Sequence, residues 1–171
     1  KFYGLKGIGA LVKKKSISID SQIKGGRSTT KYRSGTPAHP LIFSLGFALS
    51  LVLTDLEEKN KKVLSIYNYL KDSLQKINNI YLNSNEYSIP HIVNFSVLGY
   101  NSIELVHMLS EKQIYISNHS ACSSDKELSH SVLSLTKDES RARSSIRVSL
   151  SYLTTKEDID YLIKALKEIL K

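Results

Sequence analysis

The sequence predicts a fold that combines helices with a sheet, of the α/β or α+β class. Short apolar strand patterns alternate with helical patterns and short loops along most of the chain, which is typical of domains that pack helices against a sheet. The helical pattern also changes from wholly apolar to amphipathic near residues 54–60. A length of 171 residues fits one domain, or a small domain with a piece of another. We therefore place a domain boundary at this change.

The first 35 residues are predicted to form two short strands and a loop. Ala10–Val12 is an apolar run, and Ile17 and Ile19 alternate with polar residues, as in a strand with one buried face. Residues 25–35 form a polar segment punctuated by glycine, which indicates a loop.

A helix is predicted over about residues 38–54. Pro37 and Pro40 stand at its start, where a missing N–H costs little. The run Leu41–Leu53 is nearly all apolar but is shorter than the roughly 20 residues of a bilayer span. We therefore expect a helix buried on all sides in a soluble protein.

The rest of the chain alternates helices with strands. Apolar residues from Leu56 to Ile77 recur at helical spacing, with Lys and Asp on the other face. Asn101 with Glu104, and Thr154 with Glu157, have the spacing of helix caps. The other predicted elements are strands at residues 80–82, 92–98, 114–117 and 146–150, and helices at 102–112, 129–135 and from Thr154 onward.

The excess positive charge lies at one end of the chain. The formal net charge is +8, and residues 1–33 carry all of this excess. Such a stretch is either a solvated basic edge or a site for an anion, a phosphorylated cofactor or a nucleic acid. The composition, with 41% hydrophobic and 23% charged residues, excludes a disordered chain, a collagen-like repeat and a coiled-coil rod.

Cys122 is the strongest single candidate for chemistry. It is the one cysteine of the chain, which excludes an intramolecular disulfide framework and an all-cysteine metal site. Its neighbours over residues 117–125 are small and polar, so we expect an exposed loop. The thiol is either reactive or an incidental surface group, and His119 is close enough in sequence to lower its pKa. The histidines show no metal-ligand spacing, and no metal site is expected.

Two further segments suit the binding of anions. Arg147 lies on a predicted strand and shares a face with Ser145 and Ser149, so it is either half of an ion pair or a bidentate receptor for a carboxylate. The segment Arg33–Thr36 precedes a helix N-terminus, where it can cradle a phosphate or simply cap the helix.

These motifs together resemble the NifS/IscS-type cysteine desulfurases of the class V aminotransferases. The resemblance covers the whole chain and follows the order and spacing of the family. It rests on Lys1–Leu11, Arg33–Thr36, Pro90 with Asn94, Ser120–Ser124, Ser145–Leu150 and Thr154–Asp160.

The resemblance implies roles for four residues and a division of the fold. Lys1 is similar to the lysine that binds pyridoxal 5'-phosphate, and Thr36 to the residue that reaches the partner's cofactor phosphate across a dimer. Arg147 matches the residue that holds the substrate α-carboxylate, and Cys122 matches the nucleophile. Residues 1–56 would be the end of a pyridoxal-phosphate-transferase large domain, and residues 57–171 a small α+β C-terminal domain carrying the cysteine loop.

The implied activity is the conversion of L-cysteine to L-alanine, with sulfur passing through a Cys122 persulfide to an acceptor protein, either a scaffold or a thiolation enzyme. A cytoplasmic homodimer without membrane contact is implied as well. Two departures stand out: His119 where the family usually has glycine, and Ser28–Thr30 where it has a glutamine–glutamate segment. The chain starts with Lys and shows no signal peptide, so we expect part of a longer chain. Most cofactor-binding residues of the family lie upstream, and this part alone is expected to be inactive.

Two alternatives of other classes stay open from the residues alone. The basic first 33 residues, with Tyr3 and Tyr32, are compatible with a nucleic-acid-binding module, although glycines and not aromatic residues or arginine pairs interleave them. The chain is also compatible with a catalytically silent sulfur-carrier or scaffold fragment.

Overall fold

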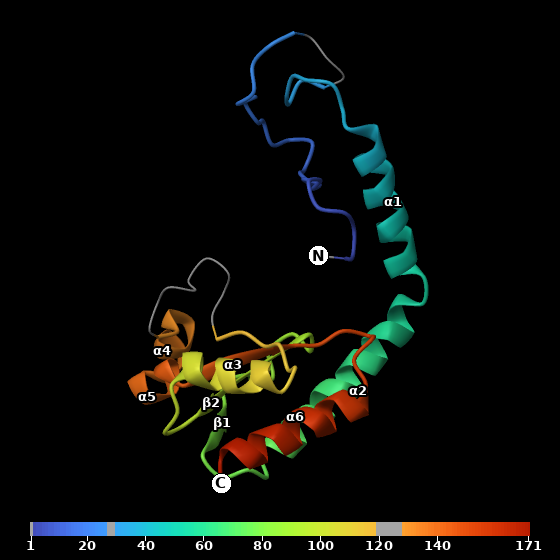
Figure 1. The fold of residues 1–171 in the computed structure, drawn as a ribbon. Coiled ribbons are helices and arrows are strands. Elements are labelled where there is room, and N and C mark those ends of the chain that lie inside the picture. Colours follow the sequence, from blue (N-terminus) through green and yellow to red (C-terminus); the bar gives the residue numbers. More distant parts are fainter. Residues whose placement is uncertain (1, 27–29, 119–127) are drawn as a thin grey trace. The chain divides into compact units, whose positions relative to one another are not determined.

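The computed structural model describes residues 2–26, 30–118 and 128–171. These residues form two compact units, Lys1–Leu56 and Glu57–Lys171, which Figure 1 shows in blue to cyan and in green to red. Helices and a sheet are combined in the second unit, so the predicted α/β class is confirmed.

The first unit consists of extended chain followed by helix α1 (His39–Leu53). The strands expected at Ala10–Val12 and at Ile17 and Ile19 are wrong, because neither segment is a strand in this structure. Val12 is 94% exposed, and no strand of the described part of this unit is available to pair with it. A strand pattern without a hydrogen-bonding neighbour does not form a sheet.

Helix α1 is exposed along its length. The expected helix is confirmed, but its expected burial is wrong for this unit, because no α1 residue is buried. Phe43 is 78% and Phe47 67% exposed. A helix that is apolar all round is stable in water only when other elements cover it, and the described residues of this unit do not supply that cover.

Among the described residues, no single helix is long and apolar enough to cross a membrane. Helix α1 and the helix after it, α2 (Leu56–Leu74), pass that test of length and composition only when they are taken together.

The second unit packs helices on a three-stranded sheet of order β1-β2-β3. Both strand pairs are antiparallel. Its elements are α2 (Leu56–Leu74), β1 (Ile80–Leu82), β2 (Ile92–Val97), α3 (Ser102–Glu111), α4 (His130–Thr136), α5 (Glu139–Arg143), β3 (Ser145–Ser149) and α6 (Lys156–Ile169).

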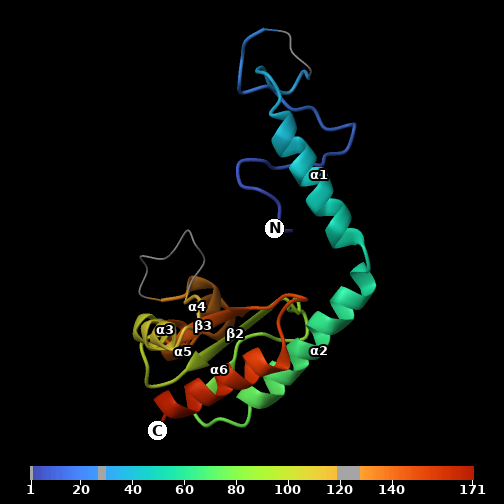
Figure 2. The ribbon, with the colours of Figure 1, turned by 45° about the vertical axis from the view of Figure 1, so that its right-hand side comes forward.

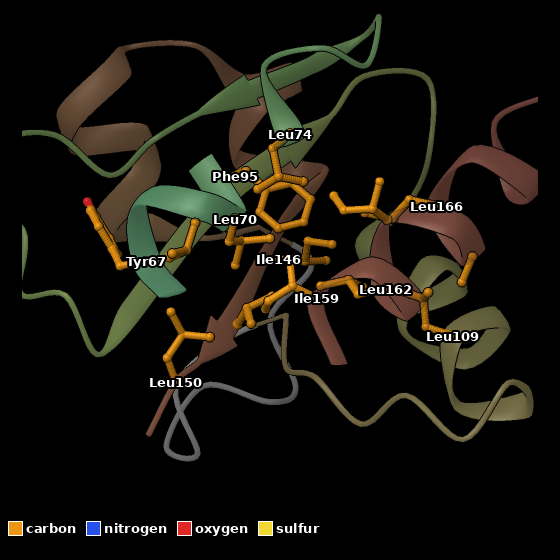
Figure 3. Close-up of a cluster of buried hydrophobic side chains, with 14 of the residues drawn as sticks. Tyr67, Leu70, Leu74, Phe95, Leu109, Ile146, Leu150, Ile159, Leu162 and Leu166 are labelled. Atoms are coloured by element: carbon orange, nitrogen blue, oxygen red, sulfur yellow. The ribbon is translucent and has the colours of Figure 1, made fainter. Parts of the chain in front are cut away.

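One face of the sheet carries the hydrophobic core. Phe95 of β2 and Ile146 of β3 are fully buried and meet Leu70 of α2 and Leu166 of α6, as Figure 3 shows. Helices α2 and α6 lie side by side (Figure 2) and are linked by a 2.6 Å hydrogen bond from the Tyr69 hydroxyl to Asp160. Their periodic apolar residues therefore form the core that the sequence pattern predicts.

The opposite face of the sheet is polar. Side chains alternate between the two faces of a strand, so Asn94 and Ser96 of β2 and Arg147 of β3 lie away from the core residues Phe95 and Ile146. Asn94 and Arg147 are direct partners in the β2–β3 register. The sheet thus places two polar side chains next to each other.

Three local predictions differ from the structure. The strand expected at 114–117 is wrong, because only Ser117 bridges to Arg147. The last helix is capped by Thr155 and Asp158 and not by Thr154 and Glu157, because the Thr154 hydroxyl instead accepts from the Ser151 amide. Helix α5 was not expected at all. The Asn101 cap of α3 is confirmed by its bond from the Ile103 amide.

Candidate functional site

A pocket of about 400 Å³ opens on the polar face of the sheet in the second unit. Of the described residues that line it, one is a cation, Arg147, and none is acidic. The lining residues are Asn83, Ser84, Ser88, Ile89, Ile92, Asn94, Asn118, Ser129, Ser131, Val132, Leu135 and Arg147. A pocket that combines apolar walls with amide and hydroxyl groups and one described cation is suited to a small anion.

Arg147 lines this pocket, and no described carboxylate pairs with its guanidinium. Its backbone is fixed, because its amide donates to the Ser117 carbonyl at 2.6 Å and its carbonyl accepts from the Ser117 amide at 3.2 Å. Its Nε atom is buried and has no hydrogen-bond partner in the structure. Within the described residues no carboxylate lies in ion-pair range of it. A buried unsatisfied donor is costly, and because Arg147 lines the pocket, a carboxylate bound there would meet a guanidinium that no described carboxylate neutralises.

A hydrogen-bonded network supports the other side of the pocket. The Asn83 amide Nδ2 donates to Asn94 Oδ1 and to Ser96 Oγ, both at 2.8 Å. Arg141 donates to Asn83 Oδ1 from Nε at 3.1 Å and from Nη2 at 2.6 Å. Asn83 and Arg141 were not predicted as site residues, because they are 58 positions apart and no sequence motif links them. Asn94, in contrast, belongs to one of the motifs that carry the family resemblance.

Two described residues close to the segment 119–127 line the pocket. These are Asn118, which directly precedes the segment, and Ser129, two positions after its end; Ser129 also caps α4 by accepting from the Val132 amide. Cys122 and His119 lie outside the described residues. An extended chain spans about 3.3–3.6 Å per residue, so the four steps from Asn118 to Cys122 cover at most roughly 14 Å.

The predicted phosphate segment lies in the first unit. Thr36 is exposed, and Gly35 adopts a positive φ of 103°, a conformation that side chains disfavour. Helix α1 follows Ala38, which has no side-chain cap bond. The N–H groups of its first turn already donate to the Pro37 and Ala38 carbonyls, and Pro40 has none, so the exposed Thr36 hydroxyl is the donor that this segment offers to an anion.

The structure describes two of the four candidate residues, and they belong to different units. Thr36 belongs to the first unit and Arg147 to the second, whereas Lys1 and Cys122 lie outside the described residues. In the described ranges no three His, Cys, Asp or Glu side chains are grouped to hold a metal ion.

Comparison with known proteins places this geometry in a family. Residues 1–162 match the family model described as aminotransferase class-V. A protein of Clostridium botulinum named cysteine desulfurase IscS is 34% identical over 176 residues, which cover 100% of this chain and 44% of that protein. A protein of the same name from Buchnera aphidicola is 36% identical over 173 residues, covering 98% of this chain and 42% of the relative.

Solved structures give the same result. A structure titled NifS-like protein superposes with a TM-score of 0.85 at 28% identity, covering 99% of this chain and 44% of the other. A NifS-like protein from Rickettsia africae gives a TM-score of 0.76 at 26% identity, covering 90% and 41%. The chain thus spans under half the length of the relatives it matches.

Proposed function

Because the chain belongs to the class V aminotransferase family, we propose that it is part of a pyridoxal-phosphate-dependent cysteine desulfurase. The support is the match over the whole chain to proteins named cysteine desulfurase IscS. The proposed reaction converts L-cysteine to L-alanine and transfers the sulfur atom to the enzyme. We also propose that residues 1–56 are the end of the large cofactor-binding domain and residues 57–171 the small C-terminal domain.

The observation that carries this proposal is the unpaired guanidinium of Arg147. Its Nε is buried without a partner among the described residues, and Arg147 lines a pocket with no acidic residue in the described part of its lining. The planar fork of an arginine binds a carboxylate through two parallel hydrogen bonds. We assign to Arg147 the binding of the α-carboxylate of the substrate, which orients the substrate in the pocket.

The first unit offers one end of a site for pyridoxal phosphate. Thr36 lies just before α1 and is exposed, so its hydroxyl is available to donate to a phosphate oxygen. This hydroxyl fits a phosphate contact, and Lys1 is the proposed cofactor lysine. The cofactor, when bound, supplies an electron sink for the bond changes at the α- and β-carbons of the substrate.

Cys122 is the proposed sulfur acceptor within the protein. Its thiolate attacks the thiol sulfur of the substrate, a sulfur–sulfur bond forms, and the carbon–sulfur bond of the substrate breaks. The carbon skeleton takes up a proton and leaves as L-alanine, and Cys122 carries a persulfide. Asn118, which directly precedes segment 119–127, and Ser129, two positions after its end, line the Arg147 pocket, which supports a Cys122 within reach of a substrate bound there.

Several finer features belong to the same proposal. They are delivery of the persulfide sulfur to a scaffold or thiolation enzyme, a role in iron–sulfur cluster assembly, a homodimer in which Thr36 contacts the partner's cofactor, and a cytoplasmic location. The family membership and the names of the relatives support them.

The nucleic-acid alternative is not favoured by the geometry of the basic region. Lys13 and Lys31 lie over the ring of Tyr32, at 5.3 Å and 5.5 Å from its centroid. These cation–π contacts occupy an aromatic face that a base would need for stacking. The comparisons name no nucleic-acid-binding relative and no silent sulfur carrier among those reported above.

The direct test is the reaction itself in the full-length protein loaded with pyridoxal phosphate. L-cysteine is supplied with a thiol reductant, and alanine and sulfide are measured. We expect equal amounts of both products from the wild type and neither from Cys122→Ser, whose cofactor absorbance is unchanged. Near-normal turnover by Cys122→Ser would remove Cys122 from the mechanism, and absence of alanine from the wild type would contradict the proposed function.

A further inference from the structure

A chain of three polar side chains leads from the surface helix α5 to the Arg147 pocket. Arg141 of α5 contacts Asn83, which follows β1, and Asn83 contacts Asn94 of β2. Asn83 is 7% exposed and Asn94 lines the pocket. The three residues come from separate elements, so the fold and not the local sequence aligns them.

Arg141 determines which way the Asn83 carboxamide faces. Its Nε and Nη2 both donate to Asn83 Oδ1, at 3.1 Å and 2.6 Å. A cation that donates twice can only be matched by the oxygen of the carboxamide. The Asn83 Nδ2 group is thereby turned to the other side, where it donates to Asn94 Oδ1 and Ser96 Oγ.

Arg141 itself is held in place by further contacts. Its Nη2 also donates to the Leu82 carbonyl at 2.7 Å, and its guanidinium lies 5.8 Å from the centroid of the Tyr81 ring. Its own carbonyl accepts from the Ser96 hydroxyl at 2.7 Å. The guanidinium is therefore a fixed reference for the orientation of Asn83.

The orientation of the Asn94 carboxamide follows in the same way. Because its Oδ1 already accepts from Asn83, its Nδ2 group is left as the free end of the carboxamide. Asn94 Nδ2 donates no hydrogen bond to any of the residues that the structure describes. Asn94 and Arg147 are partners in the β2–β3 register and both line the pocket. A free amide donor thus stands beside a free guanidinium.

We propose that Arg141 is a positioning residue that acts through Asn83 to keep the Asn94 amide donor toward the pocket, so that Asn94 and Arg147 together bind the substrate carboxylate. This inference rests on the proposed function. If the Asn94 carboxamide turned over, its oxygen would replace the donor and repel a bound carboxylate. The hydrogen bonds among Arg141, Asn83 and Asn94 therefore favour the binding of an anion at this position.

Asn83→Asp is the sharpest variant because it barely changes the shape of the side chain. The new carboxylate still accepts from Arg141, so the fold keeps its contact, but it has no N–H to donate to Asn94. We expect the KM for L-cysteine in the loaded full-length protein to rise about tenfold, the effect of one hydrogen bond to a charged group. The kcat should change little.

Variants at Arg141 and Arg143 separate positioning from a general structural role. Arg141→Leu should raise KM as Asn83→Asp does, and Arg141→Lys, which restores a donor cation, should recover part of the affinity. Arg143→Leu is the matched control, since Arg143 pairs with Glu139 on the surface of the same helix. An unchanged KM in Asn83→Asp, or an equal rise in Arg143→Leu, would overturn the proposal.

A second readout does not depend on turnover. In the full-length protein with ¹⁵N-labelled asparagine, titration with L-alanine should shift the Asn94 side-chain amide signal in the wild type, and the shift should be lost in Asn83→Asp. Absence of that shift in the wild type overturns the inference. A shift in a protein that forms no alanine from L-cysteine would preserve the carboxylate site and reject the desulfurase reaction.

Discussion

Replacement of Arg147 by lysine tests the substrate contact on which the proposed function depends. Lysine keeps the positive charge but offers a point ammonium in place of a planar fork, so it cannot donate two parallel hydrogen bonds to a carboxylate. The change removes the bidentate geometry and leaves the net charge of the pocket as it was. Any loss of affinity therefore reports geometry and not charge.

The size of the effect follows from the surroundings of Arg147. Truncating a buried, hydrogen-bonded charge contact costs about 2–5 kcal/mol. The side chain is half-buried and only its Nε is recorded as buried without a partner, so solvent screens part of the interaction. We expect a loss near the lower limit, about 2 kcal/mol, which is roughly a 30-fold rise in KM for L-cysteine.

Two assays on the full-length, cofactor-loaded protein decide the matter. Alanine formation is measured against L-cysteine concentration, and thermal unfolding is followed in the same samples, with Arg143→Lys as the control. The account predicts a raised KM for Arg147→Lys and an unchanged melting temperature, because Arg147 has no ion-pair partner in the described ranges. A normal KM with a lowered melting temperature would show that Arg147 is a structural residue and refute the reasoning.

Three further predictions concern stability and assembly. Phe95 is fully buried in the core, and Phe95→Ala should lower the free energy of unfolding by about 3–5 kcal/mol, measured by denaturant titration; a change under 1 kcal/mol would contradict this core. Residues 57–171 should unfold in one cooperative transition when expressed alone, whereas residues 1–56 should not fold; circular dichroism checks both outcomes. The isolated 171-residue chain should self-associate and bind no pyridoxal phosphate stably, as measured by gel filtration and absorbance. A monomeric chain that keeps its cofactor would be inconsistent with this prediction. The hydrogen bond and charge of Lys112 lower the pKa of Glu168, so this pair adds stability above the ordinary carboxyl pKa, and that stability is lost as pH falls through the lowered pKa. Lys112→Met should therefore have a lower free energy of unfolding than the wild type at neutral pH, and the difference should disappear in acid. A difference that does not depend on pH would exclude the ion pair as its cause.

The sequence predicted the helices of the second unit because their apolar residues recur at the spacing of one buried face. Leu70 of α2 and Leu166 of α6 sit in the core as that periodicity requires. Helix α5 was missed because five residues are too few to show a period. The cap of α6 was placed one residue early, since only the turn formed by Ser151 shows that the Thr154 hydroxyl is already used.

The first unit shows where sequence patterns are insufficient. An alternating pattern such as Ile17 and Ile19 indicates which face of a strand would be buried. It does not show whether a neighbouring strand is present to complete the backbone hydrogen bonds. The apolar character of α1 was likewise read correctly, whereas its burial depends on residues that the described part of the unit does not contain. Both differences have the same physical origin, the absence of a packing partner within the unit.

Part of the candidate site could also be predicted from the sequence, and part could not. Arg147 was predicted because apolar residues on both sides place it on the polar face of a strand, and the structure puts it in a pocket with no carboxylate among the described residues of its lining. The contact between Asn83 and Arg141 joins residues 58 positions apart, and only the fold reveals it. The roles of Lys1, Thr36 and Cys122 stay predictions.

The most direct test of the central claim is the chemical state of Cys122 after a single turnover. Full-length protein loaded with pyridoxal phosphate is mixed with a limiting amount of L-cysteine without reductant, alkylated, digested and analysed by mass spectrometry. The account predicts that the Cys122 peptide gains the mass of one sulfur atom, in proportion to the alanine formed, and that the reductant removes it. Alanine formed in full with Cys122 unmodified, or no alanine at all, would contradict the claim.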